Sequence, residues 1–250
     1  MHPARIAELL QPFLTPTQNP CHSEPGGKPG EEPAVPAVLS PTQLQSISTY
    51  IDILMRWNAR INLTAIRNEE EIVTRHFGES LFAARHLFPL YPVTSSVPPV
   101  VKDVDSAFAR PEARVADLGS GAGFPGLPIK IWAPNIALTL IESNQKKSTF
   151  LREISRALTL TNINIQTARA ETLPPSSFDV VTLRAVERQA EVLPVAAALL
   201  VPSGRLALLI ASSQLDQLHS TLPTLTWQPP IPVPESRSRL LLIGSAEPKK

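Results

Sequence analysis

A glycine-rich stretch at residues 117–126 contains the residue types best suited to bind a ligand. Its glycines allow a tight turn and let a ligand approach the backbone with no Cβ in between. The apolar run 114–118 before it is typical of a buried strand, and the segment 127–132 after it is predicted to be a helix. A strand, a glycine loop and a helix N-terminus present backbone N–H groups to a ligand. The sequence therefore predicts a ligand site here.

Two classes of ligand fit this loop. Residues 121–126 match the GxGxxG pattern of dinucleotide-binding proteins. Asp117, at the end of the strand, favours S-adenosylmethionine instead, because a carboxylate there would repel a pyrophosphate and attract a sulfonium and an ammonium. Glu142 ends the next apolar strand and can accept hydrogen bonds from the ribose hydroxyls of either cofactor. S-adenosylmethionine is the favoured ligand, and a nicotinamide dinucleotide stays as the alternative.

Further candidates follow the other predicted strands, since ligands of parallel sheets bind beyond the carboxyl ends of the strands. Ala170 and Glu171 can meet an adenine edge, although Glu171 can equally be a solvated loop acid. Arg184 ends an apolar run and is a candidate contact for substrate or cofactor, with a helix-capping or surface arginine as the alternative.

Two basic groups lie elsewhere. Lys146 and Lys147 begin the helix after Glu142, where they can contact phosphates or simply be solvated. His76, beside Arg75, lies on a helix before the glycine loop. A lone histidine in such a place is more often structural than catalytic.

Missing motifs narrow the chemistry. The sequence has no Asn/Asp-Pro-Pro-aromatic motif, which accepts an exocyclic amine in many amino-group methylases. Its one cysteine, Cys21, lies in a proline-rich segment, so covalent attack on a pyrimidine is not expected. A ring nitrogen with a free lone pair, such as guanine N7, needs no base, and positioning can supply most of the catalysis. The sequence permits this reaction without establishing it.

The elements that must position these residues follow from periodicity and capping. Residues 1–14 can form an amphipathic helix, Ser40-Pro41 begins a second one, and Glu69 to Leu87 form another. From residue 114 strands alternate with helices, which predicts parallel βαβ units. Two late runs can pair as an antiparallel edge. The predicted strands are 115–118, 136–141, 163–166, 178–183 and 204–210, the helices 126–132, 146–158 and 189–200, and the late runs 225–227 and 239–243.

We therefore divide the chain into four regions. Residues 1–41 are a helix and a proline-rich flexible arm, 42–90 a helical subdomain, 91–113 a loop insertion and 114–250 the cofactor-binding domain. A hydrophobic content of 43% supports a real core, and a net charge of +1 leaves nucleic-acid contact to local patches. No apolar run spans a bilayer and no signal peptide is evident, so we expect a cytoplasmic protein without membrane contact.

Several segments together resemble the RsmG (GidB) family of bacterial 16S rRNA methyltransferases. The resemblance covers roughly residues 42–210. It rests on Trp57-Asn58, the segment 62–67 (NLTAIR), Arg75-His76-Phe77 with Ser80-Leu81, the loop 117–126 (DLGSGAGFPG), Lys146-Lys147 with Phe150-Leu151, 168–171 (ARAE) and Arg184-Ala185. A generic methyltransferase would share the glycine loop but not the Asn-Leu-Thr segment or the Gly-Phe-Pro-Gly ending.

The resemblance implies a Rossmann-like, class I S-adenosylmethionine-dependent methyltransferase with a mostly parallel seven-stranded sheet, helices on both faces and an N-terminal helical extension. It implies methylation of N7 of a single guanine in 16S rRNA of the small ribosomal subunit, by a protein we expect to be a monomer. Arg184 is the candidate catalytic residue, and Arg75, His76, Lys146 and Lys147 are candidate RNA contacts. Cofactor contacts are assigned to Asp117, Gly119, Ser120, Gly121, Phe124, Glu142, Ala170, Glu171 and Arg184.

Two departures bear on this interpretation. Ile210-Ala211 stands where the family commonly has a Lys-Gly pair after the fifth strand, and Gly78 replaces a larger apolar residue. The first keeps open a non-catalytic protein that binds RNA or ribosomes and has kept a vestigial cofactor site. The second predicts a loosened helix before the cofactor domain.

Overall fold

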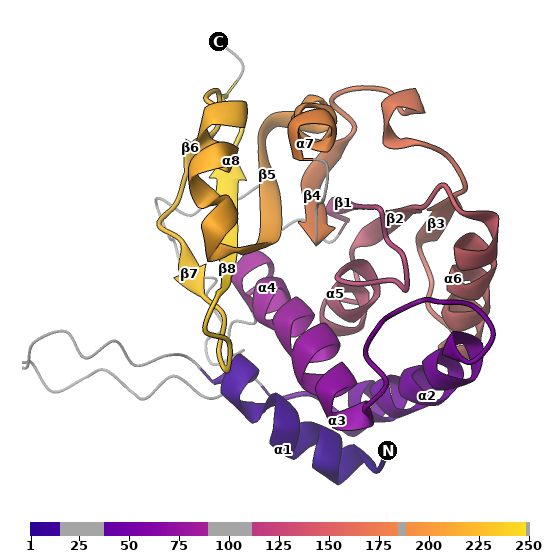
Figure 1. Cartoon of the computed structure of the whole chain (residues 1–250). Helices are drawn as coiled ribbons and strands as arrows, with labels where there is room; N and C mark the ends of the chain where they lie inside the picture. Colours follow the sequence, from indigo (N-terminus) through magenta and orange to yellow (C-terminus); the bar gives the residue numbers. More distant parts are fainter. Residues whose placement is uncertain (16–37, 90–111, 185–188, 249–250) are drawn as a thin grey trace, which may run out of the picture.

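A mostly parallel sheet forms the centre of the molecule (Figure 1). The structure is a computed structural model, and it describes residues 1–15, 38–89, 112–184 and 189–248. The strand order is β3-β2-β1-β4-β5-β8-β6, and β7 also pairs with β8. The first five strands along the chain are parallel, and β8 is antiparallel to β5. The strands are β1 (Arg114–Leu118), β2 (Ala137–Ile141), β3 (Ile163–Gln166), β4 (Phe178–Arg184), β5 (Leu200–Ala211), β6 (Thr226–Trp227), β7 (Ile231–Pro232) and β8 (Arg239–Ser245).

The strand order explains where a ligand can bind. The chain runs outward from β1 through β2 to β3, and then returns to β4 on the other side of β1. This reversal is a topological switch point, the place at which open α/β sheets bind ligands beyond their carboxyl ends. The glycine loop follows β1 directly, so the fold places it at this point.

The sheet has eight strands where the sequence predicted seven. The predicted antiparallel edge is present, but it consists of two short strands, β6 and β7, which pair with opposite ends of the same edge of β8. Pro229 and Pro230 lie between them. Proline has no N–H to donate to a neighbouring strand, so the edge is interrupted there.

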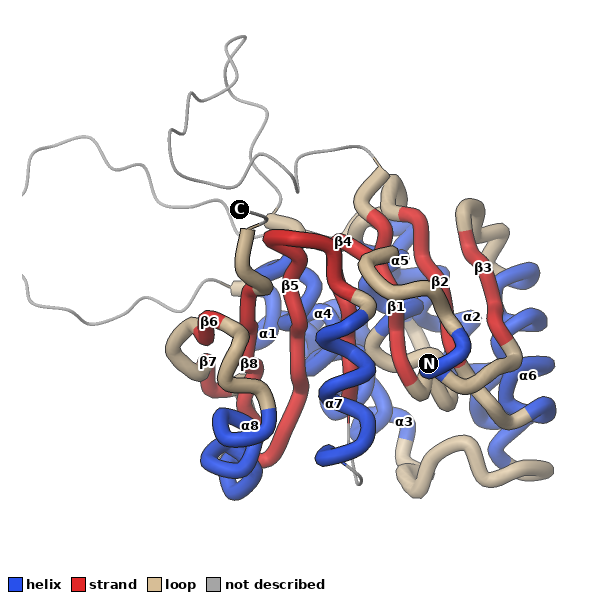
Figure 2. Tube along the Cα trace, turned by 90° about the horizontal axis from the view of Figure 1, so that it is seen from above, coloured by secondary structure: helices blue, strands red, loops and turns tan. Residues whose placement is uncertain are grey.

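Helices cover both faces of the sheet, as predicted (Figure 2). One face carries the N-terminal helices together with those that follow β1 and β2, and the other carries the helices on either side of β5. The first group is α1 (Pro3–Leu14), α2 (Pro41–Asn58), α4 (Glu79–Leu87), α5 (Gly126–Trp132) and α6 (Gln145–Ala157), and the second is α7 (Gln189–Ala198) and α8 (Leu215–Thr221).

The start of α2 has the predicted capping residues. The Ser40 side chain accepts a hydrogen bond from the Gln43 N–H, the Gln43 side chain accepts one from the Ser40 N–H, and Pro41 occupies the first turn. The inner face of α2 buries Ile47, Ile51 and Leu54. The helix thus presents Tyr50, which lies on the same buried side, towards the sheet.

The predicted helix over 69–87 is present but not uniform. It begins as α3 (Glu69–Glu71), continues as the π-helical segment η1 (Ile72–Gly78) and ends as α4. The Asn68 side chain caps its start by accepting from the Glu71 N–H. No residue pattern predicted the wider π-helical turn, a feature that is frequent at functional sites.

Gly78 lies against an aromatic ring of α1, and the prediction that it loosens this helix stays a prediction. A Cβ at Gly78 would lie 2.7 Å from the ring of Phe13, which is buried. The aromatic ring of α1 therefore occupies the space that a larger side chain would need. The family resemblance could not reveal this contact between Gly78 and Phe13, because Phe13 lies 65 residues away, outside the stretch that carries the resemblance.

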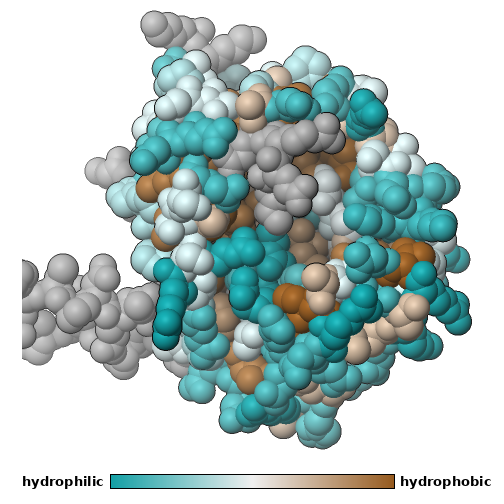
Figure 3. All heavy atoms as spheres, viewed as in Figure 1, coloured by the Kyte–Doolittle hydropathy of each residue, from teal (hydrophilic) through white to brown (hydrophobic). Residues whose placement is uncertain are grey.

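Parts of the predicted arm and insertion, residues 16–37 and 90–111, lie outside the described residues, as does Cys21. The proposed division into four regions stays a prediction. Within the described ranges, no helix has both the length and the apolar character needed to cross a bilayer. On the face drawn in Figure 3, hydrophilic side chains form most of the described surface and hydrophobic ones appear as separate patches.

Candidate functional site

The glycine loop after β1 has one open position and one tightly packed position. Gly119, Gly121 and Gly123 have φ of +66°, +56° and +87°, the left-handed region that favours glycine. A Cβ at Gly119 would meet no heavy atom within 4 Å, whereas one at Gly123 would collide with the side chains of Tyr50 and Leu127. Gly119 thus borders open space that a ligand can occupy, and Gly123 serves packing.

Glu142 lies beside this loop at the end of β2. Its Oε2 accepts a hydrogen bond from the Gly121 N–H at 2.9 Å, and its Oε1 accepts one from the Asn144 N–H at 2.8 Å. Each carboxylate oxygen can accept a second hydrogen bond. The side chain therefore holds the loop and still has acceptor capacity for ribose hydroxyls.

Asp117 lies near the end of β1, as the sequence predicted, but its side chain is directed into the protein. Its carboxylate is fully buried and accepts hydrogen bonds from the Gly126 N–H at 3.2 Å and from the Thr182 hydroxyl at 3.1 Å. Burial raises its pKa to about 7. In this structure the carboxylate faces the start of α5 and not a ligand, because Gly126 lacks a Cβ and lets its backbone approach.

Ser120 is also turned inward. It is buried, and its hydroxyl donates to the Asp117 carbonyl at 2.8 Å. The two polar side chains at the start of the loop therefore shape the backbone.

Phe124 ties the loop to the N-terminal helices. Its ring stacks on Tyr50 of α2, with centroids 5.4 Å apart, and on His76 of η1, with centroids 4.7 Å apart. The Tyr50 hydroxyl donates to the Ala122 carbonyl within the same loop. The aromatic stack thus fixes the loop from the side opposite β1, and Phe124 itself is buried.

Arg184, at the end of β4, lies in a buried network of polar groups. Its Nη2 donates to the Arg75 carbonyl at 2.6 Å and to Glu79 Oε2 at 3.0 Å, and its side chain is 9% exposed. Its Nη1 contacts His76 Nδ1 at 2.6 Å. The structure matches neither a capping nor a surface arginine, since the guanidinium is a buried ion-pair partner.

The charge and tautomer of His76 follow from its neighbours. Burial, and next the positive charges of Arg184 and Arg75, lower its pKa to about 3, so the imidazole is neutral at neutral pH. An arginine can only donate, so Nδ1 must accept, and the proton is on Nε2. Nε2 lies 2.7 Å from the Thr64 hydroxyl oxygen, which accepts that proton's hydrogen bond. We assign this tautomer from the hydrogen-bond pattern.

Sequence reasoning missed Glu79, although it singled out Arg75 and His76. Glu79 is 1% exposed and also forms an ion pair with Arg75 Nε at 2.9 Å. A signal was available, because a carboxylate four residues after an arginine on a helix is a favourable pair. Arg75 itself is 40% exposed, so part of its side chain can still meet a partner.

The remaining predicted residues lie on the surface near the strand ends. Lys146 and Lys147 occupy the first turn of α6, where the Asn144 side chain accepts from both of their N–H groups. Lys146 is exposed and Lys147 half-buried. Ala170 and Glu171 lie in a short 3-10 turn, η3 (Ala170–Thr172), with Glu171 exposed. The structure brings none of these four into the Arg184 network.

A family model described as rRNA small subunit methyltransferase G, GidB, matches residues 43–89 and 100–228. The chain belongs to this family. Ribosomal RNA small subunit methyltransferase G of Halorhodospira halophila is 37% identical over 185 residues, covering 74% of this chain and 77% of that protein. The enzyme of that name from Bacillus subtilis is 34% identical over 187 residues, covering 73% and 70%.

The GidB family membership confirms the enzyme class and the cofactor expected from the sequence, an S-adenosylmethionine-dependent methyltransferase. It excludes the nicotinamide-dependent alternative. The fold agrees: ribosomal protein L11 methylase from Lactobacillus delbrueckii subsp. bulgaricus superposes with a TM-score of 0.50 at 16% identity, covering 68% of this chain and 80% of that one. The residue assignments within the site stay predictions.

The residues present fit S-adenosylmethionine. Gly119 leaves open space at the switch point, Gly121 and Glu142 form the wall next to it, and Glu142 keeps acceptor capacity. A carboxylate that can take two ribose hydroxyls suits an adenosine. The GidB loop in this chain thus has the donor and acceptor groups that such a cofactor needs.

Proposed function

We propose that this protein methylates N7 of one guanine in the RNA of the small ribosomal subunit, with S-adenosylmethionine as methyl donor. The observation that carries the proposal is the loop 119–126 at the switch point, joined to Glu142, in a chain of the GidB family. Because its proposed substrate is ribosomal RNA, we also propose that the protein acts in the cytoplasm, and that it acts as a monomer.

The proposed roles follow from position. Glu142 accepts from the ribose, the backbone of Gly119 and Gly121 borders the cofactor, and Ala170 and Glu171 meet the adenine edge. Phe124 supports the loop from behind, since it is buried in the aromatic stack. Arg75, Lys146 and Lys147 are partly or fully exposed cations, which suits contacts with RNA phosphates.

The reaction needs no general base. S-adenosylmethionine, when bound, supplies a methyl group on a sulfonium. The N7 lone pair forms the new N–C bond as the S–C bond breaks, so the positive charge moves to the guanine and no proton is transferred. What the chain must do is hold the two partners in line. Arg184 is a cation among buried partners, which fits holding the site in shape better than contact with a base that becomes cationic.

The test uses purified protein, methyl-labelled S-adenosylmethionine and small subunits that lack the modification. We expect label in the RNA, and none with subunits that are already modified. Calorimetry on the same sample measures cofactor binding separately. Binding without label in the RNA would overturn the proposed substrate and leave the cofactor site, which is the result that a vestigial protein would give.

A further inference from the structure

Glu79 is a buried carboxylate to which the proposed reaction has so far given no role. It begins α4 and forms ion pairs with two arginines, with Arg75 Nε at 2.9 Å and with Arg184 Nη2 at 3.0 Å. A carboxylate this deep is costly unless it is paired and hydrogen-bonded. Its pairing with Arg184 joins residues 105 positions apart, on the N-terminal helices and on the end of β4.

The pairing continues to the cofactor loop in two steps. Arg184 uses its other terminal nitrogen to donate to His76 Nδ1 at 2.6 Å. The His76 ring in turn stacks on Phe124, with an angle of 19° between the planes. Glu79 is therefore bonded to the Arg184 guanidinium, which in turn contacts the His76 ring that stacks on Phe124.

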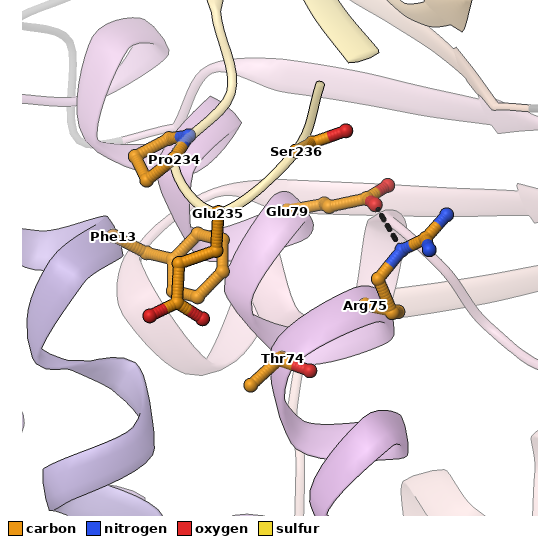
Figure 4. Close-up of a pocket in the computed structure, with 7 residues that line it drawn as sticks. All are labelled: Phe13, Thr74, Arg75, Glu79, Pro234, Glu235 and Ser236. Atoms are coloured by element: carbon orange, nitrogen blue, oxygen red, sulfur yellow. Dashed lines mark hydrogen bonds and ion pairs between the residues drawn. The ribbon is translucent and has the colours of Figure 1, made fainter. Parts of the chain in front are cut away.

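A small cavity lies beside Glu79. Figure 4 shows the cavity between α1, the helix that carries Arg75, and the turn 234–236. Its volume is about 40 Å³. Sites for small molecules are about 300–1,000 Å³, so this one has room for little more than water. In the same view the Glu79 carboxylate points to Arg75.

We propose that Glu79 is a positioning residue for cofactor binding, which acts through Arg184 and His76 on Phe124 of the loop. This deepens the proposed function and rests on it only for the identity of the cofactor. Glu79 touches neither substrate nor cofactor in this account. Glu79 acts through the Arg184 guanidinium. Its effect on cofactor affinity can therefore be distinguished from an effect on stability alone.

The test is a double-mutant cycle in the dissociation constant of S-adenosylmethionine, measured by calorimetry on the full chain. We expect Glu79→Gln to weaken binding by about tenfold, within the range of measured couplings between groups of one network. Arg184→Met is expected to weaken it at least as much. In the double variant, the loss should equal that of Arg184→Met alone. Additive losses would mean that Glu79 acts independently, and would overturn the proposal.

Two further variants keep the result interpretable. Glu79→Asp retains the charge and is expected to bind within about threefold of the natural protein, by the same reasoning on network couplings; a loss as large as that of Glu79→Gln would contradict the proposal. Glu70→Gln removes an exposed ion pair with Arg5 on the same N-terminal layer and serves as the matched control, with unchanged affinity. If Glu79→Gln does not fold, the cycle is run with Glu79→Asp in its place, and losses that add to that of Arg184→Met would overturn the proposal.

The cycle does not depend on the RNA substrate. Full coupling in cofactor affinity with no methyl transfer to small subunits would support Glu79 and overturn the proposed function. Methyl transfer to the expected guanine, with unaltered affinity for S-adenosylmethionine in Glu79→Gln, would support the proposed function and overturn the role of Glu79.

Discussion

Residues of this site fall into two groups that differ in burial and bonding. Gly119 borders open space and Glu142 keeps acceptor capacity, so we propose that both face the cofactor. Asp117 and Ser120 are buried and bonded to the protein's own groups, so they act on the backbone. The residue pattern alone could not tell these kinds apart, because both consist of small or acidic residues at a strand end.

Gly119→Ala tests the ligand-facing class. A Cβ there meets no protein atom, so we expect unfolding stability to fall by only about 1–2 kcal/mol, the cost of a non-glycine residue in the left-handed region. The methyl group would occupy the space next to the cofactor, and affinity should fall tenfold or more, about 1.4 kcal/mol per factor of ten. Calorimetry and denaturant unfolding measure the two effects. Unchanged affinity would mean that the open space at Gly119 is not the cofactor site.

Asp117 gives a prediction about pH. Burial raises its pKa to about 7 in the folded protein, above the 3.8 of the free residue, so between these pH values the folded state holds a proton that the unfolded state releases. This group's contribution to the free energy of unfolding therefore falls as pH rises from about 4 to about 7, by about 1.4 kcal/mol per pH unit at most. Urea unfolding at pH 4.5, 6 and 7.5 should show this slope in the natural protein relative to Asp117→Asn. Parallel curves for the two proteins would contradict the assignment.

At the scale of elements, the N-terminal helices pack against the glycine loop that follows β1. Tyr50 from α2 and His76 from η1 hold Phe124 between them, and Arg184 is bonded to the segment around Arg75. The sequence predicted these helices from capping and periodicity. It could not predict their docking, because the Arg184–His76 contact joins residues 108 positions apart and no local pattern encodes it.

Phe13 and Gly78 allow a test of how α1 docks. Gly78→Leu is expected to displace the Phe13 ring and to lower the free energy of unfolding by about 1–3 kcal/mol, as overpacking does. Phe13→Ala should leave a cavity and cost about 3–5 kcal/mol. In the double variant the leucine fills the space left by the ring, so the loss should be smaller than that of Phe13→Ala alone. Guanidinium unfolding measures all three; simple additivity would show that the two sites do not share this space.

Over the whole molecule, one hydrophobic cluster runs from α1 and α2 through α5 to the sheet, and it includes Phe124. The parallel sheet, its antiparallel edge and the helices that follow β1, β2 and β4 were predictable, because hydrophobic runs and glycine turns specify them locally. Three features could not be predicted, because each depends on what packs against it. They are the π-helical segment, the interrupted edge at Pro229-Pro230 and the inward direction of the Asp117 side chain.

Because the loop belongs to this shared core, cofactor binding should stabilise the entire chain. With S-adenosylmethionine at about 100 times its dissociation constant, we expect about 2.7 kcal/mol of added stability and a matching rise in the unfolding midpoint. NADH at the same concentration should give no rise. Thermal unfolding followed by circular dichroism measures both. An equal shift with both ligands would mean that the loop does not distinguish them.

The central claim is methyl transfer to N7 of a single guanine, and one chemical map tests it most directly. Small subunits that lack the modification are treated with protein and S-adenosylmethionine, and their RNA is then reduced with borohydride and cleaved with aniline, which breaks the chain at N7-methylguanine. The account predicts a single new break, dependent on both protein and cofactor. A methylated RNA that aniline leaves intact, or breaks at many guanines, would contradict it.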